Sequence, residues 1–228
     1  MKALLITGTD TNSGKTVFTT TLAAYWLKYN QQQSLGIFKP IQSGPGDREF
    51  YQEVFNLNLS LDEINPLYLK APLAPPIAAE KEGVIIDLSK VWHSFNLLCK
   101  KRDFVLVETL GGLGSPITYE ITVADLAKDW KLPTVLVANV KLGAIAQIVA
   151  NVALARYNKV NLIAIVLNCT QDYSPSEISD LTPVDLIQSL TNIPVLGCIP
   201  YIQDLKNLDH LAEIAANMDL EILSVNSK

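Results

Sequence analysis

The hydrophobic residues of this chain fall into short runs rich in β-branched side chains, and these runs alternate with longer amphipathic stretches. The runs predict strands over residues 3–7, 35–38, 104–107, 134–139, 162–167 and 195–199. Strands that are apolar on both faces are typical of a parallel sheet with helices on either side. The amphipathic stretches predict helices, most clearly over residues 15–29, 121–130, 143–157 and 207–218. This alternation predicts the α/β class, with a doubly wound, mostly parallel sheet, helices on both faces, and ligand sites at the carboxyl ends of the strands.

Two segments between the predicted elements have a different pattern. Residues 65–76 include four prolines in twelve positions, which disfavours a helix and predicts an ordered excursion over the active-site face. Residues 173–182 are polar and rich in serine and aspartate, and we expect them to form a mobile loop. Because no internal repeat or linker divides the chain, we expect residues 1–228 to form a single domain.

Composition narrows the classes of function. Hydrophobic residues make up 49% of the chain and charged residues only 18%, which favours a packed core over disorder. The formal net charge of −5 argues against nonspecific binding of nucleic acid. No apolar run approaches the span of a bilayer, and the start of the chain does not fit a secretory signal, so we expect no membrane partner. Three widely spaced cysteines, Cys99, Cys169 and Cys198, fit free thiols in the cytoplasm.

A glycine-containing loop follows the first predicted strand and opens the first predicted helix. It reads Gly8-Thr-Asp-Thr-Asn-Ser-Gly14-Lys15-Thr16, with five residues between the glycines where the P-loop pattern has four. Backbone N–H groups and a helix N-terminus bind phosphate oxygens in such a loop. Lys15 would supply a positive charge to the β- and γ-phosphates, and the Thr16 hydroxyl could bind magnesium. The loop predicts a nucleoside triphosphate site.

Charged residues also end two further predicted strands. Lys39 closes the second strand, where anionic groups of a substrate gather, and Asp47 soon after it fits a surface loop or a magnesium contact. Glu108 follows four apolar strand residues, which is the arrangement of a Walker B carboxylate near the metal of a bound nucleotide. Gly111 and Gly112 then let the backbone approach a ligand closely.

Together these segments resemble the dethiobiotin synthetase family. The resemblance lies in the Gly8-Thr-Asp-Thr opening of the loop, in Lys39-Pro-Ile-Gln-Ser43-Gly44, and in Val107-Glu108-x-x-Gly111-Gly112. Further matches at residues 75–80, 140–143, 167–168 and 197–200 extend it over nearly the whole chain. Thr109-Leu110 differs from the Gly-Ala that the family usually has at these positions.

The resemblance implies a ligase of biotin biosynthesis. Such an enzyme carboxylates 7,8-diaminononanoate with CO2 and uses ATP and Mg²⁺ to close a ring, by way of a carbamate and a carbamic-phosphoric anhydride. The products are dethiobiotin, ADP and phosphate. Members of the family are cytoplasmic homodimers whose active site lies at the subunit interface, so the implied partners are small molecules and a second copy of the chain.

The resemblance also implies roles for single residues. Lys15 and Lys39 would stabilise the carbamate and the transferring phosphoryl group, to which Thr11 would donate a hydrogen bond. Ser43 would contact the substrate, and Leu142 and Gly143 of the partner subunit would receive its carboxylate at a helix N-terminus. Thr16, Asp47 and Glu108 would hold magnesium. The residues implied to bind the nucleotide are Asn12, Ser13, Gly14, Lys15, Thr16, Val17, Asp47, Glu108, Gly111, Asn168, Pro200, Tyr201 and Ile202.

Three alternatives stay open at this point. The chain could be a related P-loop amidoligase acting on another acid, or a remnant that binds ATP without catalysis. It could also be a switch ATPase of the ParA/MinD type, although such switches carry a second lysine early in the phosphate loop and residues 9–13 contain none.

Overall fold

The computed structural model describes residues 2–225, and within them the strands form two parallel sheets. The strands are β1 (Ala3–Gly8), β2 (Leu35–Phe38), β3 (Ile41–Ser43), β4 (Leu67–Leu69), β5 (Phe104–Gly112), β6 (Thr134–Asn139), β7 (Leu162–Asn168) and β8 (Val195–Ile199). The larger sheet has the order β2-β5-β1-β6-β7-β8, and β3 pairs with β4 in a small second sheet. All neighbours in the larger sheet are parallel, which confirms the predicted strands and their direction.

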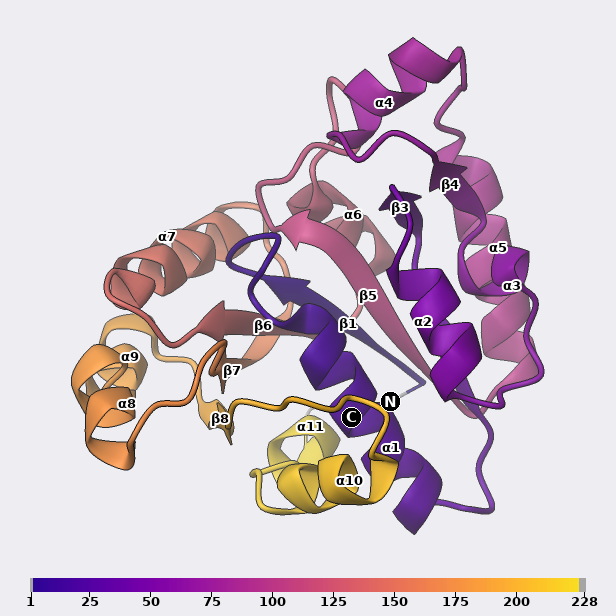
Figure 1. Cartoon of the computed structure of the whole chain (residues 1–228). Helices are drawn as coiled ribbons and strands as arrows, with labels where there is room; N and C mark the ends of the chain where they lie inside the picture. The colour runs from indigo at the N-terminus through magenta and orange to yellow at the C-terminus, as the bar shows by residue number, and fades with distance from the viewer. Residues whose placement is uncertain (1, 226–228) are drawn as a thin grey trace.

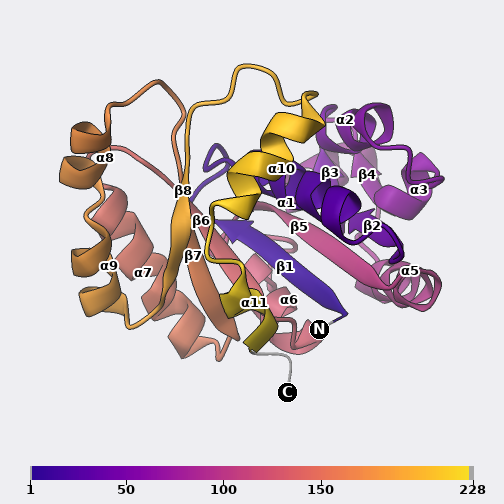
Figure 2. The ribbon, with the colours of Figure 1, turned by 90° about the horizontal axis from the view of Figure 1, so that it is seen from below.

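Helices cover both faces of the larger sheet. They are α1 (Lys15–Tyr29), α2 (Asp47–Val54), α3 (Leu61–Ile64), α4 (Pro75–Glu82), α5 (Leu88–Lys101), α6 (Val123–Trp130), α7 (Ala144–Tyr157), α8 (Pro175–Leu181), α9 (Val184–Thr191), α10 (Leu208–Ala216) and α11 (Glu221–Val225). Figure 2 shows α1 and α10 on one face and α5, α6 and α7 on the other. The prediction of a doubly wound fold is therefore confirmed.

The order of the strands brings the carboxyl ends of β1, β2 and β5 to one edge of the sheet (Figure 1). All six residues of β1 are buried, because neighbours on both sides and helices on both faces enclose it. Apolar strands of this kind bury nearly all of their surface, and they form a rigid base for the loops at that edge.

One prediction about a loop was wrong, and another was right only in part. Residues 173–182, expected to be a mobile loop, contain helix α8. Ser174 caps this helix through its side chain, which accepts from the Glu177 backbone, and Glu177 bonds back to Ser174, while Pro175 occupies the first turn. The proline-rich residues 65–76 include strand β4 and the first residues of α4, because proline is well suited to a first helical turn.

The sequence pattern also left helix α5 unpredicted. Its aromatic residues join a ring cluster with the end of α6, in which Phe95 stacks on Trp130 at 4.8 Å between ring centroids. Trp92 lies 5.2 Å from the same tryptophan. This packing fixes α5 and α6 beneath the sheet, next to the strand that carries Glu108.

Cys169 directly follows β7 and Cys198 lies in the neighbouring strand β8, and their sulfur atoms are 3.6 Å apart. Both thiols are free, as is Cys99, which confirms the prediction of free thiols.

Within the described residues, no helix is both long and apolar enough to span a bilayer.

Candidate active site

The phosphate loop connects β1 to α1 at the centre of the sheet edge. Gly14 precedes the helix with a φ of 94°, a left-handed conformation that favours glycine. A Cβ atom at this position would lie 2.2 Å from the side-chain nitrogen of Asn168, so the loop and the end of β7 are in close contact. Lys15 Nζ donates to the carbonyl oxygens of Asp10 (2.9 Å) and Thr11 (3.0 Å), and the lysine therefore folds back over the loop.

The environment of Lys15 favours the neutral, deprotonated form of its side chain. The residue is only 4% exposed. Burial lowers the pKa of its ammonium to about 8, although the nearby Glu108 carboxylate acts in the opposite direction. An anion entering the loop would restore the charged form, because it supplies the opposite charge that the buried ammonium lacks.

Lys39 and Glu108 meet because β2 and β5 are neighbours in register. Phe38 pairs with Val107, and the next residue on each strand carries a charge. Lys39 Nζ lies 2.7 Å from Glu108 Oε1 and forms a second ion pair with the Asp47 carboxylate at the start of α2. The Thr16 hydroxyl lies between the same two acids, 3.3 Å from Asp47 Oδ1 and 3.1 Å from Glu108 Oε1.

The ion pairs keep this buried cluster charged. Burial disfavours the ammonium of Lys39, but the carboxylates of Glu108 and Asp47 outweigh that effect and raise its pKa. Burial also disfavours the Asp47 carboxylate, and the adjacent Lys39 overcomes this and lowers the pKa of Asp47. Glu108 is 0% exposed, and Lys39 is the cationic group beside its carboxylate.

The donor set around Lys39 fits a magnesium ion. Thr16, Asp47 and Glu108 present a hydroxyl and two carboxylates, which are the hard oxygen ligands that this ion prefers. A cationic group already bridges the two acids, which shows that the place between them suits positive charge. Within residues 2–225 no group of three or more His, Cys, Asp or Glu side chains is arranged to hold a metal.

A cavity of about 680 Å³ opens beside this cluster and the phosphate loop. The predicted site residues that line it are Thr11, Asn12, Lys15, Thr16, Lys39, Ser43, Asp47, Glu108 and Gly111. The proline-rich excursion closes another side through Pro72, Leu73, Ala74 and Pro75, which confirms that this segment lies over the site. The cavity thus brings two lysines, two carboxylates and the phosphate loop together.

Other predicted site residues lie around this cavity rather than on its wall, as far as the described residues define it. Ser13 is buried in the phosphate loop, and Val17 is in the first turn of α1. Asn168 touches the loop at Gly14. Pro200, Tyr201 and Ile202 follow β8, with Tyr201 45% exposed.

Leu142 and Gly143 lie at the start of α7, where Leu142 is 90% exposed. They line a different, apolar hollow along that helix.

Thr109 turns into the sheet, where its hydroxyl lies 3.3 Å from the carbonyl oxygen of Ile6, whereas Leu110 lines the central cavity.

Tyr51 belongs to the site and was missed in the sequence. It is 0% exposed, and its hydroxyl donates to Glu108 Oε2. Burial and the charge of Glu108 raise the pKa of this phenol well above its usual value, so it stays a donor. The available signal was its spacing: Tyr51 follows Asp47 by four residues and so shares its face of α2.

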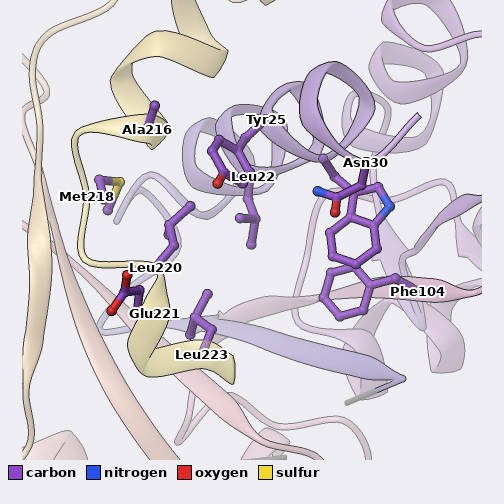
Figure 3. Close-up of a pocket in the computed structure, with 10 residues that line it drawn as sticks. Leu22, Tyr25, Asn30, Phe104, Ala216, Met218, Leu220, Glu221 and Leu223 are labelled. Carbon is purple, nitrogen blue, oxygen red and sulfur yellow. The ribbon is translucent and has the colours of Figure 1, made fainter. Parts of the chain in front are cut away.

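A second cavity, of about 510 Å³, lies at the far end of α1 (Figure 3). Apolar side chains from α1, the start of β5 and the segment after α10 surround it, among them Leu22, Phe104 and Met218. Trp26 stacks on Phe104 at 4.3 Å between centroids and lines one side. None of its described lining residues belongs to the predicted site.

Comparison with known proteins gives relatives over nearly the whole chain. A family model described as an AAA domain matches residues 2–209. The ATP-dependent dethiobiotin synthetase BioD of Gloeothece citriformis is 54% identical over 223 residues, which cover 98% of this chain and 99% of the relative. The protein of the same name from Crocosphaera subtropica is 52% identical, over 98% of this chain and 100% of its own.

The similarity to solved structures is one of fold. The MinC:MinD cell division protein complex of Aquifex aeolicus matches with a TM-score of 0.63 at 14% sequence identity, over 100% of this chain and 98% of that chain. The sequence relatives are far closer than this structural neighbour, and the resemblance seen in the loop and strand-end segments is confirmed. The chain belongs to the family of ATP-dependent dethiobiotin synthetases.

Proposed function

We propose that this protein uses ATP to carboxylate 7,8-diaminononanoate with CO2 and to close the ring of dethiobiotin, as a ligase of biotin biosynthesis in the cytoplasm. The observation that carries the proposal is the meeting of Lys39, Asp47 and Glu108 beside the phosphate loop, on one cavity. This cavity can hold a triphosphate and a second anion next to each other. The names of the relatives supply the substrate class.

In the proposed reaction an amine of the substrate takes up CO2, and the carbamate oxygen attacks the γ-phosphate of ATP. Lys15 and Lys39 both line the cavity, so their ammonium groups can stabilise the charge that develops on the carbamate and the phosphoryl oxygens. Thr11 can donate to the same phosphoryl group. The second amine then attacks the carbamate carbon, which closes the ring and expels phosphate.

A magnesium ion held by Thr16, Asp47 and Glu108 would neutralise charge on the β- and γ-phosphates. Asn168 supports a base contact beside the loop, because its Oδ1 atom is buried without a hydrogen-bond partner among the described residues. Pro200, Tyr201 and Ile202 would complete the base pocket.

We further propose that the chain folds as one domain and acts as a homodimer through α7. Exposed apolar residues follow one side of this helix at Ala146, Val149, Ala150 and Ala153. Leu142 and Gly143 at its N-terminus would then reach the partner's cavity, where the backbone N–H groups can bind the substrate carboxylate. Ser43 would contact the same substrate from within the cavity.

The reaction gives a direct test of the proposal. Purified protein should release phosphate from ATP only when both 7,8-diaminononanoate and bicarbonate are present. Dethiobiotin should accumulate in equal amount, as measured by mass spectrometry. Phosphate release that is independent of the diamine would contradict the proposed function, as would a requirement for ammonia.

Lys39→Gln tests the catalytic lysine. We expect kcat to fall by about 10²–10³-fold or more, because one preorganised charge at the reacting oxygens is lost. Affinity for a nonhydrolysable ATP analogue, measured by calorimetry, should change little because Lys15 and the loop remain. Lys90→Gln, at an exposed position on α5, is the matched control. An unchanged kcat in Lys39→Gln would remove this lysine from the mechanism.

A further inference from the structure

The two oxygens of the Glu108 carboxylate have different partners. Oε1 accepts from Lys39 Nζ at 2.7 Å and from the Thr16 hydroxyl at 3.1 Å, on the side of the cavity. Oε2 accepts from the hydroxyl of Tyr51, which comes from α2. The carboxylate is therefore held from both ends, with one oxygen toward the proposed metal site and the other turned away from it.

The Tyr51 hydroxyl has little freedom to move. Its ring contacts two aromatic neighbours, Phe50 on α2 at 5.7 Å between centroids and Phe55 just after the helix at 6.5 Å. Tyr51 and Glu108 are both 0% exposed, so water does not compete for the bond. A buried carboxylate oxygen that lost this donor would be left without a partner, which is costly.

The orientation of the Glu108 carboxylate limits how it can bind a cation. Ca²⁺ takes six to eight oxygen ligands and often binds both oxygens of one carboxylate, whereas Mg²⁺ demands a near-ideal octahedron, which a carboxylate bound through both oxygens would distort. Because the Tyr51 hydroxyl holds Oε2 on the side of α2, Oε1 is the oxygen presented to the metal site, where Lys39 and Thr16 donate to it. Asp47, which starts the same helix, has no contact with Tyr51 of this kind and keeps Thr16 and Lys39 as its partners.

We propose that Tyr51 is a positioning residue that restricts Glu108 to coordination through one oxygen and thereby makes the metal site select Mg²⁺ over Ca²⁺. The inference rests on the proposed magnesium site at Thr16, Asp47 and Glu108. Tyr51 itself does not line the cavity as the described residues define it, so its effect passes through Glu108.

Tyr51→Phe tests this role, because it keeps the ring and removes only the hydroxyl. Mg²⁺ and Ca²⁺ are titrated calorimetrically into protein saturated with a nonhydrolysable ATP analogue, and the titration of nucleotide alone is subtracted. We expect Mg²⁺ affinity to fall by about 10–100-fold, the usual effect of losing a partner of a metal ligand. Ca²⁺ affinity should stay unchanged or rise, so that the preference for Mg²⁺ drops by at least about tenfold.

Tyr119→Phe is the matched control. The Tyr119 hydroxyl also donates to a glutamate, Glu80 at 2.7 Å, but this pair is on the surface, and the variant should keep the preference of the unmodified protein. If the unmodified protein binds neither metal, the proposed magnesium site itself is wrong. If it prefers Mg²⁺ and Tyr51→Phe keeps the same preference, the role of Tyr51 is overturned while the site stands.

A second measurement needs no variant. Infrared difference spectra of protein labelled with ¹³C-glutamate report whether a glutamate carboxylate binds a metal through one oxygen or two. We expect one-oxygen binding with both Mg²⁺ and Ca²⁺. A two-oxygen signature with Ca²⁺ in the unmodified protein would overturn the inference even if Tyr51→Phe did not fold.

Discussion

At the scale of single residues, the site is a set of buried charges that depend on one another. Lys39 and Glu108 are almost completely enclosed, and each is the ion-pair partner of the other. Lys15 differs from them because its nearest partners are the carbonyl oxygens of Asp10 and Thr11 rather than carboxylates. Its charge is therefore the one most sensitive to pH and to an incoming anion.

Nucleotide binding is expected to take up protons at alkaline pH. The pKa of Lys15 is about 8 in the free protein, and phosphate groups beside it would raise this value. At pH 8.5 a nonhydrolysable ATP analogue should bind with uptake of up to one proton, and above pH 8 its affinity should fall by up to about tenfold per pH unit. Calorimetry in buffers of different ionisation enthalpy measures the uptake.

The lowered pKa of Lys15 also makes the free energy of unfolding depend on pH. Because the folded pKa lies below the unfolded one, the folded protein loses this proton first, and the free energy of unfolding should rise between about pH 8 and the usual lysine pKa. Lys15→Met should remove both the proton uptake and this rise. If Lys15→Met takes up as many protons on nucleotide binding as the unmodified protein, another group is the one that is protonated.

At the scale of elements, the site depends on how α1 begins. The phosphate loop ends at Gly14, in a left-handed conformation and against the amide of Asn168 from β7. Gly14 is therefore the position at which the loop, α1 and β7, a strand two places from β1 in the sheet, are in contact. A side chain at this position would disturb all three.

Gly14→Ala is expected to abolish nucleotide binding and to destabilise the fold. The left-handed backbone alone costs about 1–2 kcal/mol for alanine, and the new Cβ would also displace Asn168. Gly83→Ala is the control, since Gly83 has a φ of 64° but no atom within 4 Å of the added Cβ. Urea denaturation and calorimetry should show a similar backbone cost but normal binding in the control. Normal nucleotide affinity in Gly14→Ala would show that the loop can rearrange.

At the scale of the whole molecule, α7 has two apolar sides. Ile148 and Val152 pack inward against the sheet, while Val149 and Ala150 are exposed next to them. Leu142, at the start of the helix, is 90% exposed and does not contribute to the core. An exposed apolar surface beside an inward-packed one is typical of a face that contacts another protein molecule.

Val149→Glu should therefore dissociate the proposed homodimer. A buried carboxylate on each subunit at the interface would lack a partner. Sedimentation equilibrium should show monomers, and KM for 7,8-diaminononanoate should rise while nucleotide affinity is unchanged. Leu97→Glu, at an exposed position on α5, is the control and should remain dimeric. An unmodified protein that is monomeric at micromolar concentration would contradict the proposed assembly.

The apolar strands were predictable because a strand buried on both faces needs hydrophobic side chains at nearly every position. Lys39 and Glu108 follow two such predicted strands, so their place at the same edge of the sheet was predictable too. The register that puts Lys39 next to Glu108 was not predictable, since it depends on how β2 and β5 pair. Tyr51 was missed for a related reason: its contact depends on the angle at which α2 crosses the end of the sheet.

Helix α8 was missed because its composition is that of a loop. Its formation depends on local capping by Ser174 and Glu177, which a pattern of hydrophobic residues does not reveal. The predicted positions of Leu142 and Gly143 are compatible with a site shared between subunits, but one subunit does not bring them to the cavity that the described residues form.

The position of β1 has a consequence for folding during synthesis. This strand pairs with β5 and β6. Leu5 pairs with Val107 and Thr134, so its partners are synthesised only about a hundred residues later. At roughly 5–20 residues per second, the ribosome takes several seconds or more to make those partners. During that time a strand that is fully buried in the finished protein is an unpaired apolar segment, exposed to chaperones and to aggregation. The arrangement that centres the phosphate loop in the sheet also makes folding depend on contacts that form late.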